Sequence, residues 1–242
     1  MKAIETVGLT KKFREKTAVN GLNLSIEQGE LYALLGVNGA GKTTTIKMLS
    51  GLLVPTSGEA KILGYDLHNS LPEIKARIAV SPQETAVASN LTVRENLEMI
   101  AGIYGADRTA AKKRTDRLME ELRLHEVEKS KAKTLSGGWQ RRLSIAMALV
   151  SEPELLFLDE PTLGLDVLAR RELWSVIRAL KGKVTVILTT HYLEEAQALA
   201  DHIGIMNSGK LRMSATAQEI LDAAGESDFE AAFVKLAGGA EE

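Results

Sequence analysis

The sequence predicts an α/β protein that combines a β-rich lobe, a core sheet and an inserted helical lobe. Three observations carry this prediction. Short apolar strands separated by turns occupy about the first sixty residues, and helical spacing with mixed charge follows from Val93. Buried-type strands that alternate with a helix return after Val150. We expect one domain over residues 1–242, because α/β domains of this length are common.

The opening segment reads as short strands around one helix. A helix from Lys42 to about Ser50 interrupts them, and Gly51 suits its C-terminal end. Gly29 and the turn from Pro55 to Gly58 separate the strands. The predicted strands cover residues 3–7, 22–26, 31–36 and 59–63.

The middle segment predicts helices. Apolar residues from Val93 to Tyr104 recur at the spacing of one helical face. Residues 107–133 carry dense mixed charge, which is typical of a solvated helix surface with ion pairs rather than of a binding site. We place the helical lobe at about residues 84–150.

The last third returns to strands and helices. Strands are expected at 154–160, 184–191, 202–206 and 209–213, with a helix over 169–182. Residues of about 1–83 and 151–213 would then form the β lobe and core. Helices follow over about 214–242, where Phe229, Ala232, Phe233 and Leu236 share one face that should dock on the body.

Composition excludes several classes of function. A formal net charge of −2 provides no basic field for nucleic acid as the main partner. The absence of cysteine excludes disulfides, thiolate metal sites and a cysteine nucleophile. No stretch approaches the roughly 20 apolar residues of a spanning helix, and no secretory signal is evident at the N-terminus. We therefore expect a soluble chain that depends on another protein for any crossing of the membrane.

A phosphate-binding loop lies between an apolar strand and a helix. Gly36, Gly41, Lys42 and Thr43 fit the pattern G-x-x-x-x-G-K-[ST] in its required context. The glycines let backbone N–H groups turn toward an anion, and the helix N-terminus adds partial positive charge. Lys42 would reach the outer phosphates, and the Thr43 hydroxyl would bind Mg²⁺.

An acidic pair follows the strand at 154–160. Asp159 and Glu160 lie at its carboxyl end, where open α/β sheets bind ligands. Adjacent strand residues point to opposite sides, so the two acids can have different roles. Asp159 would hold Mg²⁺ through water, and Glu160 would orient and deprotonate the attacking water.

A second glycine loop, "LSGGWQRR" at 135–142, resembles the signature of the ATP-binding cassette (ABC) family. Other motifs of that family follow the expected order: Gln83 in "VSPQE", the turn "LGLD" ending at Asp166, and His191 after "VTVILTT". A lone Ser-Gly-Gly is more often a helix N-cap, whereas the ordered set covers essentially the whole chain. The resemblance implies a P-loop NTPase fold with a RecA-like core sheet, an antiparallel β lobe and a helical lobe.

The resemblance also assigns roles to individual residues. Glu160, His191 and Gln83 would be catalytic, with His191 contacting the γ-phosphate and Gln83 touching Mg²⁺ or the attacking water. Asp166 would contact a second subunit. The residues expected to bind the chain's own ATP are Phe13 under the adenine, Gly36, Asn38, Gly39, Ala40, Gly41, Lys42, Thr43 and Thr44. Those expected to reach the partner's ATP are Ser136, Gly137, Gly138 and Gln140.

The family implies an ATP-binding and ATP-hydrolysing subunit with ATP and Mg²⁺ as cofactors. Two such domains, identical or different, would pack head to tail, so that each ATP lies between one phosphate loop and the partner's signature. Closure would drive a separate transmembrane permease, which places the chain in the cytoplasm, on the inner face of the membrane. The segment 84–97 would receive the permease. The loop "GVNGAGKTTTIKML" and the closing "DFEAAFVKL" look most similar to the drug, antibiotic and small-cation export branch, although Val37 replaces a frequent proline.

Two other functions remain open at this point. A soluble cassette ATPase could act in cluster assembly or on ribosomes or DNA, but no second cassette or coiled-coil insert is present. A regulatory subunit without hydrolysis would usually have lost Glu160, Ser136 or His191, and all three are intact.

Overall fold

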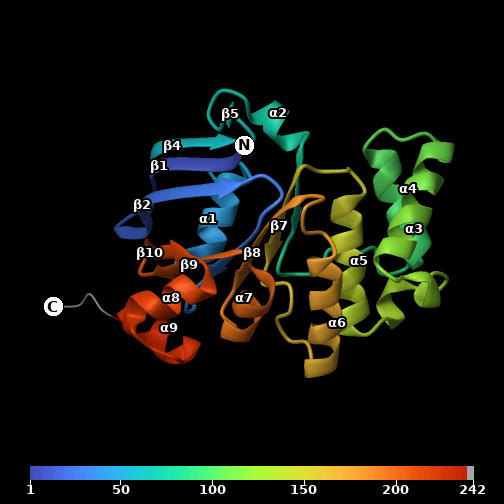
Figure 1. Cartoon of the computed structure of the whole chain (residues 1–242). Helices are drawn as coiled ribbons and strands as arrows, with labels where there is room; N and C mark the ends of the chain where they lie inside the picture. Colours follow the sequence, from blue (N-terminus) through green and yellow to red (C-terminus); the bar gives the residue numbers. More distant parts are fainter. Residues whose placement is uncertain (239–242) are drawn as a thin grey trace.

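The computed structural model describes residues 1–238 and contains two sheets, with helices between and around them (Figure 1). The strands are β1 (Lys2–Phe13), β2 (Lys16–Glu27), β3 (Leu31–Leu35), β4 (Ser57–Ile62), β5 (Tyr65–Asp66), β6 (Ile78–Ser81), β7 (Leu155–Asp159), β8 (Thr185–Thr190), β9 (His202–Asn207) and β10 (Lys210–Ala215). The helices are α1 (Lys42–Leu49), α2 (Leu71–Lys75), α3 (Val93–Ile103), α4 (Arg108–Glu121), α5 (Gly137–Leu149), α6 (Val167–Arg178), α7 (Leu193–Leu199), α8 (Ala217–Ala224) and α9 (Phe229–Gly238).

The two sheets differ in strand direction. The four-stranded sheet has the order β2-β1-β4-β5 and is antiparallel throughout. The six-stranded sheet has the order β10-β9-β3-β8-β7-β6, and only the pairing of β10 with β9 is antiparallel in it. This arrangement confirms the predicted α/β class with an antiparallel β lobe.

The strands β3, β7 and β8 of the six-stranded sheet are buried at every position, which explains their largely apolar sequences. Side chains of β3 alternate between two cores: Leu31, Ala33 and Leu35 join one, and Tyr32 and Leu34 join the other. The second core also contains α1 and the antiparallel sheet, whereas the first contains α3 to α9. Figure 1 shows α1 enclosed between the sheets and α3 and α4 at the far end of the molecule.

The helices between residues 93 and 149 match the predicted helical segment. The side-chain hydroxyl of Thr92 accepts from Glu95 N, and the Glu95 carboxylate accepts from Thr92 N, so a capping box starts α3. Val93, Leu97 and Ala101 are buried, as the spacing of apolar residues predicts. The capping box fixes where α3 begins after the loop that holds Gln83.

The C-terminal helices dock on the body as expected. Phe229 and Ala232 are buried in the larger core, and Phe233 and Leu236 pack against it. The last four residues of the predicted helical segment, 239–242, lie outside the described residues. Among the helices of residues 1–238, none has both the length and the apolar composition that a bilayer-spanning segment requires.

Four short elements were not expected from the sequence: β5, α2, β6 and α7. Each has between two and seven residues, too few for a hydrophobic period to be distinguished. The register of β6 against β7 still matters for the site, because it brings the Gln83 loop beside the end of β7.

Candidate functional site: a phosphate loop facing two acids

The loop between β3 and α1 has the geometry of an anion site. Gly39 and Gly41 have φ values of 83° and 105°, a left-handed region that favours glycine. A Cβ on Gly36 would lie 2.4 Å from the carbonyl oxygen of Met206, so this position also needs glycine for close packing. No side chain caps the start of α1, and its first turn contains no acidic residue. The helix N-terminus is therefore available to a negatively charged ligand.

Lys42 lies inside the loop with its side chain almost fully buried, at 5% exposure. Its Nζ donates to the carbonyl of Gly36 at 2.7 Å and to that of Val37 at 3.3 Å. The same Nζ lies 3.4 Å from Oε1 of Glu160. Because these contacts hold the cation at the mouth of the loop, it faces any anion that the loop binds.

Asp159 and Glu160 contact different groups, as the sequence predicts. Oδ1 of Asp159 accepts from the Thr43 hydroxyl at 3.1 Å and from the Thr189 hydroxyl at 2.6 Å. A carboxylate oxygen of Glu160, Oε2, lies 2.5 Å from Nδ1 of His191. Asp159 thus contacts two hydroxyl groups, and Glu160 contacts an imidazole ring.

The prediction that alternation along the strand separates the two acids is wrong. Pleating does not separate the acids, because β7 ends at Asp159 and Glu160 adopts a left-handed φ of 49°. This conformation costs a residue other than glycine about 1–3 kcal/mol and persists only where the surroundings hold it. Glu160 N donates to both Oγ1 and O of Thr189, at 3.0 and 3.2 Å, which turns the carboxylate toward Lys42 and His191.

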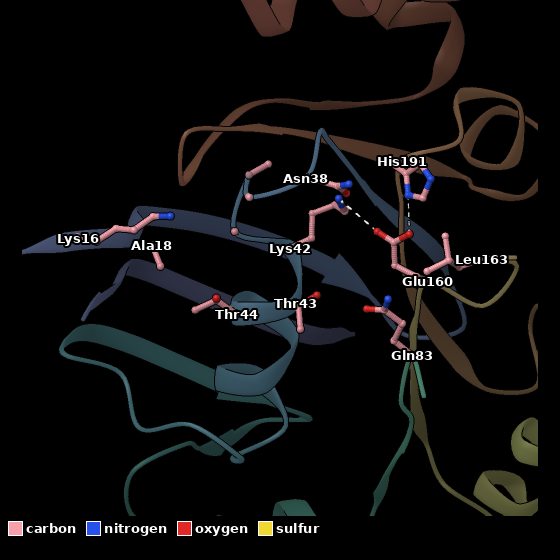
Figure 2. A pocket seen from close by; sticks show the side chains of 13 residues that line it. Lys16, Ala18, Asn38, Lys42, Thr43, Thr44, Gln83, Glu160, Leu163 and His191 are labelled. Atoms are coloured by element: carbon pink, nitrogen blue, oxygen red, sulfur yellow. Dashed lines mark hydrogen bonds and ion pairs between the residues drawn. The ribbon is translucent and has the colours of Figure 1, made fainter. Parts of the chain in front are cut away.

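A pocket of about 290 Å³ gathers most of the predicted residues (Figure 2). In Figure 2 the Glu160 carboxylate lies between the side chains of Lys42 and His191, with Gln83 and Thr43 nearby. The lining residues are Lys16, Ala18, Asn38, Gly39, Ala40, Gly41, Lys42, Thr43, Thr44, Gln83, Glu160, Leu163 and His191.

Phe13, predicted to lie under the adenine, does not line this pocket. Its ring is 46% exposed at the end of β1, and the ammonium of Lys11 lies 5.2 Å from the ring centroid. Adenine stacking on Phe13 therefore stays a prediction. Lys16 and Ala18, which sequence analysis missed, line the pocket from β2. In the sequence, the one indication that they line the pocket is their position at the start of β2, the strand that faces the phosphate loop.

The signature loop lies outside the pocket. Ser136 and Gly137 are exposed at the start of α5, and the Ser136 side chain makes no capping bond to that helix. Ser136 occupies the N-cap position of α5, but its hydroxyl does not cap the helix, so the N-cap alternative does not explain this side chain. A Cβ on Gly138 would lie 3.1 Å from Cβ of Ala169, so glycine also allows α5 to approach α6 closely.

Gln140 contacts its own loop in the single chain, and its contact with a partner's ATP stays a prediction. Its side-chain nitrogen donates to the carbonyls of Ala132 and Leu135, at 3.1 and 3.2 Å. The amide thus holds its own loop in the single chain. The motif identifies this glutamine as part of the signature, but the fold of residues 132–135 decides where it points.

Asp166 caps α6. Its Oδ1 accepts from the backbone N–H groups of Leu168 and Ala169, both at 2.9 Å. Beside it, Val167 and Leu168 are exposed apolar side chains, at 59% and 74%. The predicted contact of Asp166 with a second subunit would therefore come from a turn that its own carboxylate holds rigid.

The donor set suits Mg²⁺. Among residues 1–238 no group of three or more histidines, cysteines or acids could hold a metal ion by itself. The hard oxygen donors that Mg²⁺ prefers are present: the Thr43 hydroxyl and the Asp159 carboxylate meet at 3.1 Å beside the phosphate loop. An ion that takes few protein ligands and completes its shell with phosphate and water fits this pair.

Comparison with known proteins identifies the family. A family model described as "ABC transporter" matches residues 19–163, which include the phosphate loop, the signature and both acids. The chain belongs to the ABC transporter family. Its fold agrees: "Structure of ATP binding subunit of ABC transporter" superposes with a TM-score of 0.83 and 30% identity, covering 97% of this chain and 99% of that chain.

Similar ABC proteins carry names that refer to export and resistance. The chain is 42% identical over 225 residues to the "Daunorubicin/doxorubicin resistance ATP-binding protein DrrA" of Streptomyces peucetius, covering 93% of this chain and 68% of that protein. It is 41% identical over 239 residues to the "Probable multidrug ABC transporter ATP-binding protein YbhF" of Escherichia coli (strain K12). That match covers 96% of this chain but only 41% of YbhF.

A further ABC structure shows a dimer. The "Dimeric structure of a post-hydrolysis state of the ATP-binding cassette MJ0796 bound to ADP and Pi" has a TM-score of 0.77 and 27% identity to this chain. The superposition covers 88% of this chain and 98% of that chain. That relative, which has the same fold, thus binds nucleotide and forms a dimer.

Proposed function

We propose that this chain is the ATP-binding and ATP-hydrolysing subunit of an ABC transporter, with ATP as substrate and Mg²⁺ as cofactor. One observation carries the proposal. The buried cation Lys42 and the acid Glu160 lie 3.4 Å apart in the pocket that the phosphate loop lines, with His191 bonded to the same acid.

The phosphate loop and Lys42 would bind the β- and γ-phosphates. The uncapped N-terminus of α1 offers N–H donors, and Lys42 would exchange its contact with Glu160 for a phosphate oxygen. That exchange leaves the Glu160 carboxylate free to accept a proton from water. ATP binding would therefore free Glu160 to act as the base, because both events depend on the contact between Lys42 and Glu160.

Glu160 and His191 would act on the attacking water. Glu160 would orient the water and accept its proton, a contribution of roughly 10²–10⁴ in rate. His191, hydrogen-bonded to Glu160 through Nδ1, has its other ring nitrogen to place toward the γ-phosphate. Thr43, Asp159 and Gln83 would hold Mg²⁺, which would neutralise developing charge on the phosphates.

The signature loop would serve a second cassette. Ser136 to Gly138 do not line the pocket of their own chain, whereas Ser136 and Gly137 are exposed. In a head-to-tail pair, identical or not, they would contact the partner's γ-phosphate and draw the two subunits together. To shift the dimer from mostly open to mostly closed, ATP must bind the closed form more tightly than the open form by about 5.5 kcal/mol. Two ATP sites with charge-assisted hydrogen bonds can together supply this difference.

Closure would drive a separate transmembrane permease of an exporter through contact with residues outside the pocket. We assign that contact to residues 84–97, which join the Gln83 loop to α3, and place the chain on the cytoplasmic face of the membrane. Relatives named as a probable multidrug ABC transporter protein and as a daunorubicin/doxorubicin resistance protein support an exporter. Copurification of a polytopic membrane protein supports this assignment, whereas copurification with ribosomes or DNA would favour the soluble alternative.

The variant Glu160→Gln tests the catalytic proposal. It keeps the size of the side chain but removes the base, so ATP turnover should fall by roughly 10²-fold or more, while binding of ATP is retained. Glu194→Gln is the matched control, because Glu194 is exposed and lies in the first turn of α7, which follows the neighbouring strand β8. Wild-type turnover in Glu160→Gln would refute the role of Glu160.

A further inference from the structure

Arg141, on the signature helix α5, has a buried guanidinium whose recorded hydrogen bonds within residues 1–238 all go to backbone carbonyls. Nε donates to the oxygen of Pro161 at 2.8 Å, and Nη2 donates to that of Asp159 at 2.7 Å. Nη1 donates to the oxygens of Pro82 and Gln83, the latter at 3.2 Å. Only 4% of the residue is exposed. One side chain of α5 thus touches two loops of the core.

Two of these bonds bracket Glu160. Asp159 and Pro161 are its neighbours in the chain, and both of their carbonyls are held by the same planar group. Glu160 itself has the left-handed φ of 49°. Because a residue other than glycine leaves this conformation unless its surroundings hold it, the fixed fork of Arg141 is suited to maintaining it.

The third arm reaches the loop of Gln83, which lines the same pocket. The position of α5 relative to the core therefore affects both the base and the residue expected to touch Mg²⁺ or water. In Figure 1, α5 lies beside β7 and connects the core to the region of α3 and α4. A rotation of the helical lobe would pull on these bonds directly.

Burial of a charged guanidinium that makes no ion pair with the described residues costs free energy, and this cost argues for a specific role of Arg141. Burial lowers the pKa of the Arg141 guanidinium, and the nearby carboxylates of Asp159, Glu195 and Glu160 oppose that shift. None of the ion pairs recorded among residues 1–238 includes this group. Carbonyl dipoles alone satisfy its donors, and a lysine of similar charge has no planar fork to reach three directions.

We propose that Arg141 is a positioning residue that holds the strained backbone of Glu160 and joins it to the Gln83 loop and the signature helix. The inference rests on the proposed role of Glu160 as general base. It implies that the base is correctly placed only while α5 is docked on the core, so that movement of the helical lobe controls hydrolysis.

The test is a split between kcat and KM in Arg141→Lys. We expect kcat to fall about 10- to 100-fold, the effect of a small misplacement of a catalytic group, with KM for ATP changed by less than about threefold. Arg142→Lys is the matched control. Arg142 is also buried on α5, but it stacks on Trp139 and pairs with Glu172 without a recorded contact to either loop.

Several outcomes would overturn the inference. Equal kcat losses in the two lysine variants, or an increase in KM alone, would show that Arg141 does not position the base. Arg141→Gln is the second variant: its shorter, neutral side chain has only two donors and cannot reach both loops, so its kcat should fall at least as far as that of Arg141→Lys. Failure of both Arg141 variants to fold would make the residue purely structural and would also overturn the proposal.

Glu160→Gln measured in parallel separates this inference from the proposed function. If Glu160→Gln retains turnover, the role of the base fails. If Glu160→Gln loses turnover while Arg141→Lys keeps it, only the positioning role fails.

Discussion

Thr189 connects the two acids and offers a sharp test of the site's geometry. Its hydroxyl donates to Oδ1 of Asp159 at 2.6 Å and accepts from Glu160 N at 3.0 Å, and the residue is fully buried. The variant Thr189→Val keeps the shape of the side chain and removes both bonds. The Asp159 carboxylate would keep the Thr43 hydroxyl as its partner.

The expected magnitude follows from the two bonds. A hydrogen bond to a charged group contributes about 1.5–3 kcal/mol and a neutral one about 0.5–1.5 kcal/mol. Thr189→Val should therefore lower the free energy of unfolding by about 2–4 kcal/mol, which a domain of ordinary stability survives. Because both acids lose a fixed partner, kcat should fall about 10- to 100-fold.

The assays are urea unfolding and steady-state ATP hydrolysis, with Thr185→Val as control. Thr185 is buried on the same strand, β8, but its hydroxyl accepts from Gly29 N, at 3.0 Å, far along the strand from the acids. We expect Thr185→Val to lose about 1 kcal/mol of stability and to retain kcat. A kcat of Thr189→Val equal to that of the control would refute the idea that Thr189 positions the acids.

Three further predictions concern packing, protonation and assembly. Gly36→Ala should lower the melting temperature and ATP affinity, because the new Cβ would lie 2.4 Å from the carbonyl of Met206; an unchanged melting curve would contradict this. Burial raises the pKa of Glu195, so its protonation contributes stability that is complete below the unfolded value of 4.5 and is lost as pH rises through the folded-state pKa. Glu195→Gln should therefore unfold at higher urea than the wild type at pH 8 and lose that advantage toward pH 4, whereas a constant difference would argue against the linkage. Leu168→Asp should weaken ATP-dependent dimerisation at least about tenfold while leaving ATP binding intact, because the side chain is 74% exposed beside Asp166; dimerisation of normal affinity would place the interface elsewhere.

Local sequence patterns were sufficient for most of the fold and for the centre of the site. The phosphate loop is continuous in sequence, so the glycines and Lys42 could be identified before any contact was known. Long strands and helices, such as β8 and α3, repeat their apolar period often enough to be recognised. The acids and His191 follow strands of one sheet, and parallel strands bring such residues to one edge.

Features that depend on tertiary contacts could not be predicted. The direction of Gln140 is set by the carbonyls of a neighbouring turn, and the left-handed backbone of Glu160 is set by Thr189 and Arg141. Neither is encoded by periodicity. Phe13 was assigned by resemblance, whereas Lys16 and Ala18 line the pocket because of how β1 and β2 pair.

Cysteine crosslinking between two chains tests the shared ATP site most directly. The chain has no cysteine, so Val37→Cys in one Glu160→Gln chain and Thr134→Cys, beside the signature, in another introduce the only thiols. Both positions are exposed, and Val37 lies in the phosphate loop. With a short thiol crosslinker, we expect a mixed covalent dimer that requires ATP and Mg²⁺. Crosslinking within a single chain that carries both cysteines, or no ATP-dependent product, would contradict the proposal that one ATP joins two subunits.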